Sequence, residues 1–250
     1  MIAVIPNTPQ IGPMFRRLDP AQIVETARQV RQRVTERFPN AGLQRVAVEV
    51  VEVTESAAAD RAWFASPHWP LRIAVGFFIL LLVLVFVATF LAVLQLPATS
   101  SIPDVVQAVD SFISEIVFLG LAIVFLSSLE VRRKRRRALW AIHELRSIAH
   151  VIDMHQLTKD PERIVNPRLG DDTASSPVRT MTTFELSRYL DYCSELLSLL
   201  SKCAAIYAQD FDDPVTISAV NDIESLTSGL SRKIWQKITV LNSRPLGSDR

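Results

Sequence analysis

The chain has 250 residues, with 27 basic and 26 acidic side chains and a net charge of +1. Length alone permits one or two soluble domains, but the apolar residues are gathered in segments that argue against a purely soluble protein. The two cysteines, Cys193 and Cys203, lie ten residues apart on one predicted helix. They are too far apart along that helix for a disulfide, and there is no Cys-x-x-Cys pair, so we predict no metal site from cysteine.

The first part of the chain predicts an extended segment followed by two cytoplasmic helices. Residues 1–19 contain three prolines and read as extended. Within 20–66, Asp19-Pro20 is a helix start, and Pro39 ends the first helix. The stretch 43–54 is ambiguous, because RVAVEVVEV is rich in strand-forming valine whereas its charged residues recur at helical spacing. We predict a helix from 40 to about 64.

Two apolar segments predict a transmembrane hairpin over 71–130. Residues 71–96 carry a single charge, Arg72 at the start, and are long enough to cross a bilayer as a helix. Residues 105–129 form the second span, which follows after the short link PATSSIPD. The link has no Lys or Arg, whereas basic residues flank the hairpin on its other side. The positive-inside rule therefore places both termini in the cytoplasm of a bacterial-type inner (plasma) membrane.

A basic run directly follows the second span and begins the segment 131–160. The run fits a topology anchor, a site for anionic lipid headgroups, or both. We expect no nucleic acid as partner, because the run is held at the membrane surface. Its residues are Arg132, Arg133, Lys134, Arg135, Arg136 and Arg137.

The rest of the chain predicts more helix. Residues 131–160 lack Pro and Gly and continue the second span as a helix, and 161–181 form a linker. A helical hairpin over 182–241 begins at a capping box, Thr182 with Glu185, and its second helix starts at Asp213 as N-cap followed by Pro214. A tail follows over 242–250. The predicted fold class is an all-α membrane protein: a two-helix transmembrane hairpin, N-terminal cytoplasmic helices and a C-terminal cytoplasmic helical hairpin. The cytoplasmic helices are expected to pack on each other or on a second copy.

Polar residues on one side of the second span form the first candidate site: Asp110, Ser111, Ser114 and Glu115. Glu115 lies at membrane depth, where an acid usually faces protein or water. One interpretation is a helix–helix contact with small serines in it. The other is the outer mouth of a cation-attracting oligomeric pore.

The stretch HELRSIAHVIDMHQL holds three of the four histidines and forms the second candidate site. His143 and His150 share a helix face but lie about 10.5 Å apart along the axis, too far to share one metal ion. A Ser147–His150–Asp153 group on one straight helix lacks the elbow and oxyanion site of a hydrolase. We favour a contact face, packed on the cytoplasmic hairpin or on a second copy, over a solvated surface; its residues are His143, Arg146, Ser147, His150, Asp153 and Met154.

The sequence contains no phosphate loop, dinucleotide fingerprint or nucleophile elbow. We therefore expect no enzyme, no cofactor and no metal. The favoured function is an oligomeric scaffold or partner-recruiting module that acts through its cytoplasmic helices. Its expected partners are membrane lipids, further copies of itself and an unidentified cytoplasmic protein. The alternative is a homo-oligomeric ion channel or membrane-perturbing effector.

Overall fold

The computed structural model describes residues 17–66, 69–94, 102–161, 175–176 and 180–243, and the regular structure in these ranges is α-helical, without a strand. The predicted all-α class is therefore confirmed for this part of the chain. Most of the predicted extended segment, linker and tail, and most of the link between the spans, lie outside the described residues. The helices are α1 (Pro20–Arg37), α2 (Gly42–Ala65), α3 (Trp69–Leu94), α4 (Ile102–Ser127), α5 (Leu129–Leu157), α7 (Thr183–Gln209) and α8 (Pro214–Asn242).

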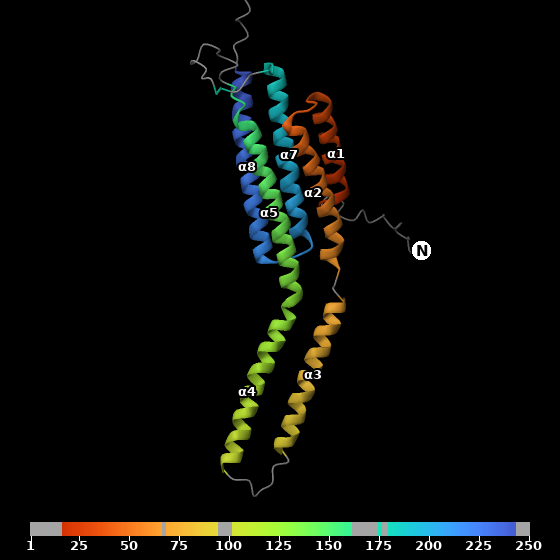
Figure 1. Cartoon of the computed structure of the whole chain (residues 1–250), viewed down its shortest axis with the longest axis vertical. Helices are drawn as coiled ribbons and strands as arrows, with labels where there is room; N and C mark the ends of the chain where they lie inside the picture. The colour runs from red at the N-terminus through yellow and green to blue at the C-terminus, as the bar shows by residue number, and fades with distance from the viewer. Residues whose placement is uncertain (1–16, 67–68, 95–101, 162–174, 177–179, 244–250) are drawn as a thin grey trace, which may run out of the picture. The chain divides into compact units, whose positions relative to one another are not determined.

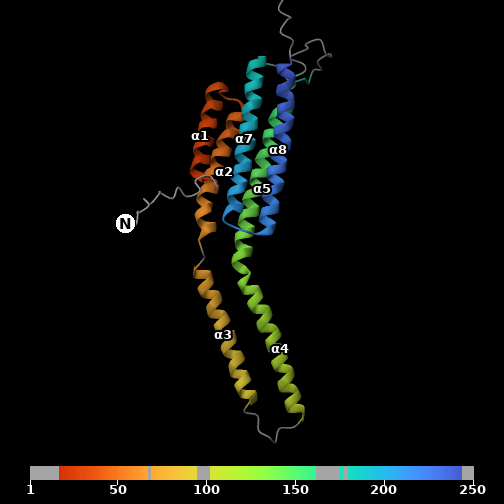
Figure 2. The same cartoon turned by 180° about the vertical axis from the view of Figure 1, so that it is seen from behind.

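The chain divides into two units, which are described separately. One unit comprises residues up to Ala65 together with those from Ala138 onward, and the other comprises Ser66–Arg137. In the first unit α1, α2, α7, α8 and most of α5 lie side by side, as both views show (Figure 1, Figure 2). Their buried side chains form a single hydrophobic cluster. The sequence left open whether these helices pack on each other or on a second copy, and in this structure they pack on each other.

The helix starts of the first unit follow the predicted capping residues. The Asp19 carboxylate accepts a hydrogen bond from the Ala21 amide at 3.0 Å. Thr182 and Glu185 form the reciprocal capping box, and Asp213 caps α8 ahead of a proline. Each cap provides an acceptor for an amide that has no partner within its helix. These local interactions explain why the starts of α1, α7 and α8 could be placed from sequence.

Residues 43–54, which the sequence left between strand and helix, are helical in α2. The apolar side chains recur every three or four residues on the buried side, whereas Arg45, Glu49 and Glu52 are exposed. A strand would alternate its buried positions every second residue. The buried positions are Leu43, Val46, Ala47, Val50, Val51, Thr54 and Ala57.

The second unit contains the two apolar helices. α3 and α4 are neighbours whose aromatic rings meet, because Phe112 stacks on Phe86 at 5.1 Å between ring centroids and lies 5.6 Å from Phe90. The helical stretch Gly42–Leu91, which includes α3, contains a window of mean hydropathy 3.0, and Val109–Leu157, which includes α4, contains one of 2.3. Both windows are apolar enough to cross a membrane. By length and composition, both helices fit the predicted spans.

The predicted continuation of the second span into residues 131–160 is helical, with Ser128 as a single turn residue between α4 and α5. The backbone ladder runs through this residue, because the Ser128 amide donates to the Val124 carbonyl at 3.2 Å and the Ser128 carbonyl accepts from the Arg132 amide at 3.0 Å. The hydroxyl of Ser127 donates to the Val124 carbonyl at 3.0 Å, and that of Ser128 donates to the Phe125 carbonyl at 2.8 Å. Hydroxyl bonds of this kind compete with the amide ladder, and here they accompany one irregular residue without ending the helical path.

Candidate functional site

The helix α5 has two opposite faces with different surroundings. The face that enters the bundle is apolar and buried, and it belongs to the common hydrophobic cluster. Leu145, Ala149 and Ile152 are at most 1% exposed. Burial of this face fixes the helix firmly in the bundle. Its buried residues are Ala138, Ala141, Ile142, Leu145, Ile148, Ala149 and Ile152.

The opposite face of α5 is exposed although it carries large apolar side chains. Trp140 is 70% exposed, and Met154 and Leu157 are each 64% exposed. Three polar residues lie between them, at spacings that alternate between three and four, and all three are exposed. We name this surface the α5 heptad face; it consists of Trp140, His143, Ser147, His150, Met154 and Leu157.

The predicted contact face coincides with the centre of the α5 heptad face, but its edges differ. His143, Ser147, His150 and Met154 are exposed within the single chain, so the cytoplasmic hairpin does not cover them. Coverage by a second copy stays a prediction. Arg146 and Asp153 lie half-buried at the border. Each has a partner there, since Arg146 lies 3.6 Å from Asp222 of α8, and Asp153 accepts a hydrogen bond from Gln156.

Sequence reasoning missed Trp140 and Leu157, the two ends of the α5 heptad face. The signal was present, because both residues continue the alternating spacing of the histidine stretch in either direction. They were left out because the predicted contact face was drawn around the polar residues beside His143 and His150. Their inclusion changes the character of the surface from a polar stripe to an amphipathic one.

The third histidine of the stretch, His155, lies on a different side of α5 and is half-buried. Its ring covers Gly42 at the start of α2, where a methyl group would come within 2.3 Å of the ring. Burial lowers the pKa of His155, and the positive charges of Arg45 and Lys159 lower it further. His155 is thus a packing residue between α5 and α2 rather than a member of the exposed face.

The C-terminal end of α5 is held by Lys237 of α8. Its ammonium group donates to the backbone carbonyls of Gln156 at 2.7 Å and Lys159 at 3.1 Å. A cation at this end satisfies carbonyls that lack partners in the helix and opposes the helix dipole. The α5 heptad face is therefore presented by a helix that is fixed at its end as well as along its buried side.

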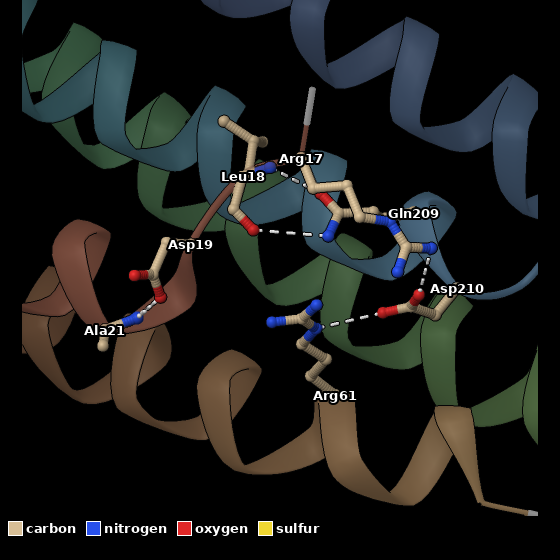
Figure 3. A network of polar contacts seen from close by, with 7 residues as sticks. All are labelled: Arg17, Leu18, Asp19, Ala21, Arg61, Gln209 and Asp210. Atoms are coloured by element: carbon tan, nitrogen blue, oxygen red, sulfur yellow. Dashed lines mark hydrogen bonds and ion pairs between the residues drawn. The ribbon is translucent and has the colours of Figure 1, made fainter. Parts of the chain in front are cut away.

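A polar network joins α1 and α2 to the end of α7 (Figure 3). Asp210 accepts hydrogen bonds from Arg17 at 2.8 Å and from Arg61 at 3.0 Å. The Gln209 side chain accepts from the Leu18 amide at 2.8 Å and donates to the Leu18 carbonyl at 3.3 Å. Because every charge in it is paired, this network serves to join helices rather than to bind a ligand.

The polar residues predicted inside the second span lie on α4. Asp110, Ser111 and Ser114 are exposed in the single chain, and Glu115 is half-buried. The Thr89 hydroxyl of α3 lies 3.5 Å from a carboxyl oxygen of Glu115, at the outer limit of hydrogen bonding. Glu115, which the sequence predicts at membrane depth, therefore has a polar neighbour on the adjacent helix that sequence analysis had not identified.

The basic run occupies the first turns of α5. Arg132, Arg133, Arg136 and Arg137 are exposed, whereas Lys134 and Arg135 are half-buried. The ammonium group of Lys134 lies 3.2 Å from Glu130 and donates to the Ser66 carbonyl at 3.2 Å. The guanidinium of Arg132 lies over the ring of Phe125 at 5.3 Å. Within the run, Lys134 thus pairs with neighbouring residues, whereas the side chains of Arg132, Arg133, Arg136 and Arg137 are exposed.

The first unit also contains an open groove between α1 and α7, with Trp235 of α8 at one side. Its volume is about 980 Å³. The groove is crossed by an ion pair between Arg33 and Glu195 at 2.9 Å, and Arg188 pairs with Asp191 along one wall at 3.0 Å. These four charges are paired with one another, and the ammonium group of Lys202, which also lines the groove, donates to the Ser198 hydroxyl at 2.6 Å.

Among the residues that the structure describes, no group of three or more His, Cys, Asp or Glu side chains is placed to hold a metal ion. In comparisons with known proteins, no family model, curated protein or solved structure matched the chain.

Proposed function

We propose that this chain is a two-span membrane protein that acts by assembly rather than catalysis, as an oligomeric scaffold or partner-recruiting module. The observation that carries the proposal is the α5 heptad face. A tryptophan, a methionine and a leucine, each more than 60% exposed, lie on one side of a helix whose other side is buried. Single exposed apolar residues are ordinary on protein surfaces, whereas an apolar row on one helix face is typical of a protein–protein contact.

The composition of the α5 heptad face supports a protein partner. Trp140 offers a large apolar area with a polar N–H group, and tryptophan is enriched among the residues that dominate binding energy. Met154 adapts its shape to a partner surface. The two histidines and Ser147 add hydrogen-bonding groups between these apolar positions.

Membrane anchoring by α3 and α4 belongs to the same proposal. We place both termini in the cytoplasm of a bacterial inner membrane, since basic residues flank the hairpin on the side of the helical bundle. The exposed guanidinium groups of Arg132, Arg133, Arg136 and Arg137 are suited to anionic lipid headgroups. The bundle would then be a cytoplasmic module tethered to the bilayer.

The proposal is tested by site-specific photo-crosslinking in native membranes. A photoreactive phenylalanine analogue is introduced at Met154 in the full-length chain, and a matched variant carries it at Arg31, which is exposed on α1. We expect a discrete protein adduct from position 154 and none from position 31. If neither position yields an adduct at native expression level, the assembly function is wrong.

An oligomeric channel or membrane-perturbing effector is the second candidate function. Asp110, Ser111 and Ser114 favour it, because exposed polar side chains along the outer half of a span need water or another chain beside them. The purified protein in liposomes would then conduct cations, and Glu115→Gln would change the selectivity among them. Ion flux equal to that of empty liposomes would exclude this function while leaving the scaffold proposal intact.

A further inference from the structure

We propose that the occupant of the α5 heptad face is the same face of a second copy of this chain, paired in parallel and in register. The inference rests on the proposed assembly function and specifies its partner. It follows from the spacing of the face, the direction in which membrane anchoring presents it, and its charge.

The spacing of the exposed residues matches a two-stranded coiled-coil seam. Trp140, Ser147 and Met154 are seven residues apart and take the a positions. His143, His150 and Leu157 are likewise seven apart and take the d positions. The buried residues of α5 fall at the remaining positions on the other side, so pairing along this seam leaves the bundle core undisturbed.

Membrane anchoring selects the direction of pairing. In copies inserted in the same orientation, α5 follows the second span directly and on the same side of the bilayer. Symmetric pairing of identical faces then places each residue opposite its own counterpart. An antiparallel pair would instead place the two α5 starts, each joined to a span, at opposite ends of the seam.

The lack of charge along the seam favours the equally uncharged face of a second copy over a strongly charged partner. No Asp, Glu, Lys or Arg occupies an a or d position between Trp140 and Leu157. In a parallel pair each g residue faces the e residue five positions further along the other helix. Glu144 then faces Leu139, Arg146 faces Val151 and Asp153 faces Thr158, so no two like charges meet across the seam.

The same register predicts where the pairing begins. Arg133 and Arg136 occupy the a and d positions of the preceding heptad and are exposed. In a parallel pair each would face its own counterpart and repel it. The close contact is therefore confined to Trp140–Leu157, and these arginines are left to turn toward lipid headgroups.

The test is disulfide crosslinking of the full-length protein in native membranes. The native thiols do not interfere, because Cys193 and Cys203 are buried and burial raises the pKa of each to about 12. Ser147→Cys and Met154→Cys are made separately, with Arg31→Cys on α1 as the exposed control. Facing a and d positions of a parallel pair fall within disulfide reach, which requires Cα atoms less than about 7 Å apart.

We expect both face variants to form a species of twice the chain's mass on mild oxidation, and the control to remain monomeric. Position 154 decides the direction, because in an antiparallel pair it would face the region of His143 instead. A Met154→Cys/His143→Cys mixture that crosslinks, while Met154→Cys alone does not, would overturn the parallel register.

A second measurement separates the seam from general aggregation. In detergent, the double variant Trp140→Ala/Met154→Ala should have at least about tenfold weaker self-association than the unmodified chain, since buried aromatic anchors dominate such contacts. Its circular dichroism should be unchanged, because both side chains are exposed in the single chain. Unaltered self-association would overturn the proposal.

The photo-crosslinking at position 154 distinguishes failure of this inference from failure of the proposed function. An adduct of twice the chain's mass supports self-pairing. An adduct of any other mass overturns self-pairing and leaves the assembly function standing with a different protein partner. The absence of every adduct overturns both.

Discussion

At the scale of single residues, the His155 ring packs so closely against Gly42 that it leaves no room for a side chain there. A Cβ atom at this position would lie 2.3 Å from Cε1 of His155 and just over 3 Å from both ring nitrogens. We predict that Gly42→Ala destabilises the bundle by about 1 kcal/mol or more, because the ring must leave its packed position. Thermal unfolding followed by circular dichroism in detergent measures the effect.

The control for Gly42 is the same substitution in a chain that also carries His155→Ala. Without the ring, the added methyl group meets no clash, and alanine is favoured over glycine in a helix. The substitution should therefore leave the melting temperature unchanged or raise it in this background. An equal loss of stability in both backgrounds would show that the clash with His155 is not the cause.

The lowered pKa of His155 predicts a pH dependence of stability. Its pKa is depressed in the folded state by burial and by the charges of Arg45 and Lys159, so the unfolded chain takes up the proton more readily. The contribution of neutral His155 is complete above the unfolded pKa of about 6.5. It is lost as the pH falls below that value toward the folded pKa.

The measurement is the melting temperature between pH 7.5 and about 5.5, a range that includes the ordinary pKa of histidine. His155→Gln should flatten the decrease on acidification, since glutamine does not titrate. His150→Gln serves as the matched control, because His150 lies on the exposed side of the same helix. If the two variants have identical pH profiles, His155 does not carry the dependence.

At the scale of elements, Asp210 joins the end of α7 to α1 and α2, which lie far from it in the sequence. Its side chain is 12% exposed and pairs with Arg17 before α1 and with Arg61 of α2. We predict that Asp210→Asn lowers the free energy of unfolding by about 1–2 kcal/mol, as charge-assisted hydrogen bonds are weakened. Arg17 is largely exposed, so most of the loss should come from the pair with Arg61.

The neighbouring acid provides the comparison for Asp210. Asp212 lies in the same turn but is exposed, so Asp212→Asn should change the melting temperature by less than Asp210→Asn. The two variants carry the same change in net charge. Equal effects would mean that the charge of the turn, rather than the ion pairs to Arg17 and Arg61, determines stability.

Elements whose ends are set by neighbouring residues could be predicted from the sequence. Asp19, Thr182 and Asp213 each act within a few residues, and the three helices that they cap start where expected. The continuation of the second span into α5 was predicted for the same kind of reason, because residues 131–160 contain neither Pro nor Gly, and only Ser128 between α4 and α5 departs from the helix.

Contacts between elements that are far apart in the chain could not be predicted from the sequence. Arg17 and Arg61 reach Asp210 across 193 and 149 residues, and no local spacing relates them. The exposure of Trp140 and Leu157 is of the same kind, because it depends on which helices cover each face of α5. The sequence predicted the polar centre of that face from the spacing of the histidines, whereas its apolar ends required the packed bundle.

At the scale of the whole molecule, the distribution of basic residues predicts the orientation in the membrane. Six consecutive basic residues, 132–137, follow the second apolar helix, and Arg61 and Arg72 precede or begin the first, whereas the link between them has no Lys or Arg. Positive residues near span ends are retained in the cytoplasm. We predict that a fluorescent protein fused to either terminus fluoresces in the bacterial cytoplasm, and that alkaline phosphatase fused there is inactive.

The basic run should carry most of this preference, because the two arginines before or within the first span are fewer and further apart. Replacing residues 132–137 by glutamine should therefore yield a mixed population, in which part of the C-terminal phosphatase fusion becomes active. The matched control replaces Arg31, Arg33 and Arg37 of α1, which are distant in sequence from the spans, by glutamine and should keep a single orientation. An active phosphatase on the unmodified C-terminus would contradict the proposed topology. It would also place the α5 heptad face outside the cytoplasm, while leaving its parallel pairing possible, since both copies would be inverted together.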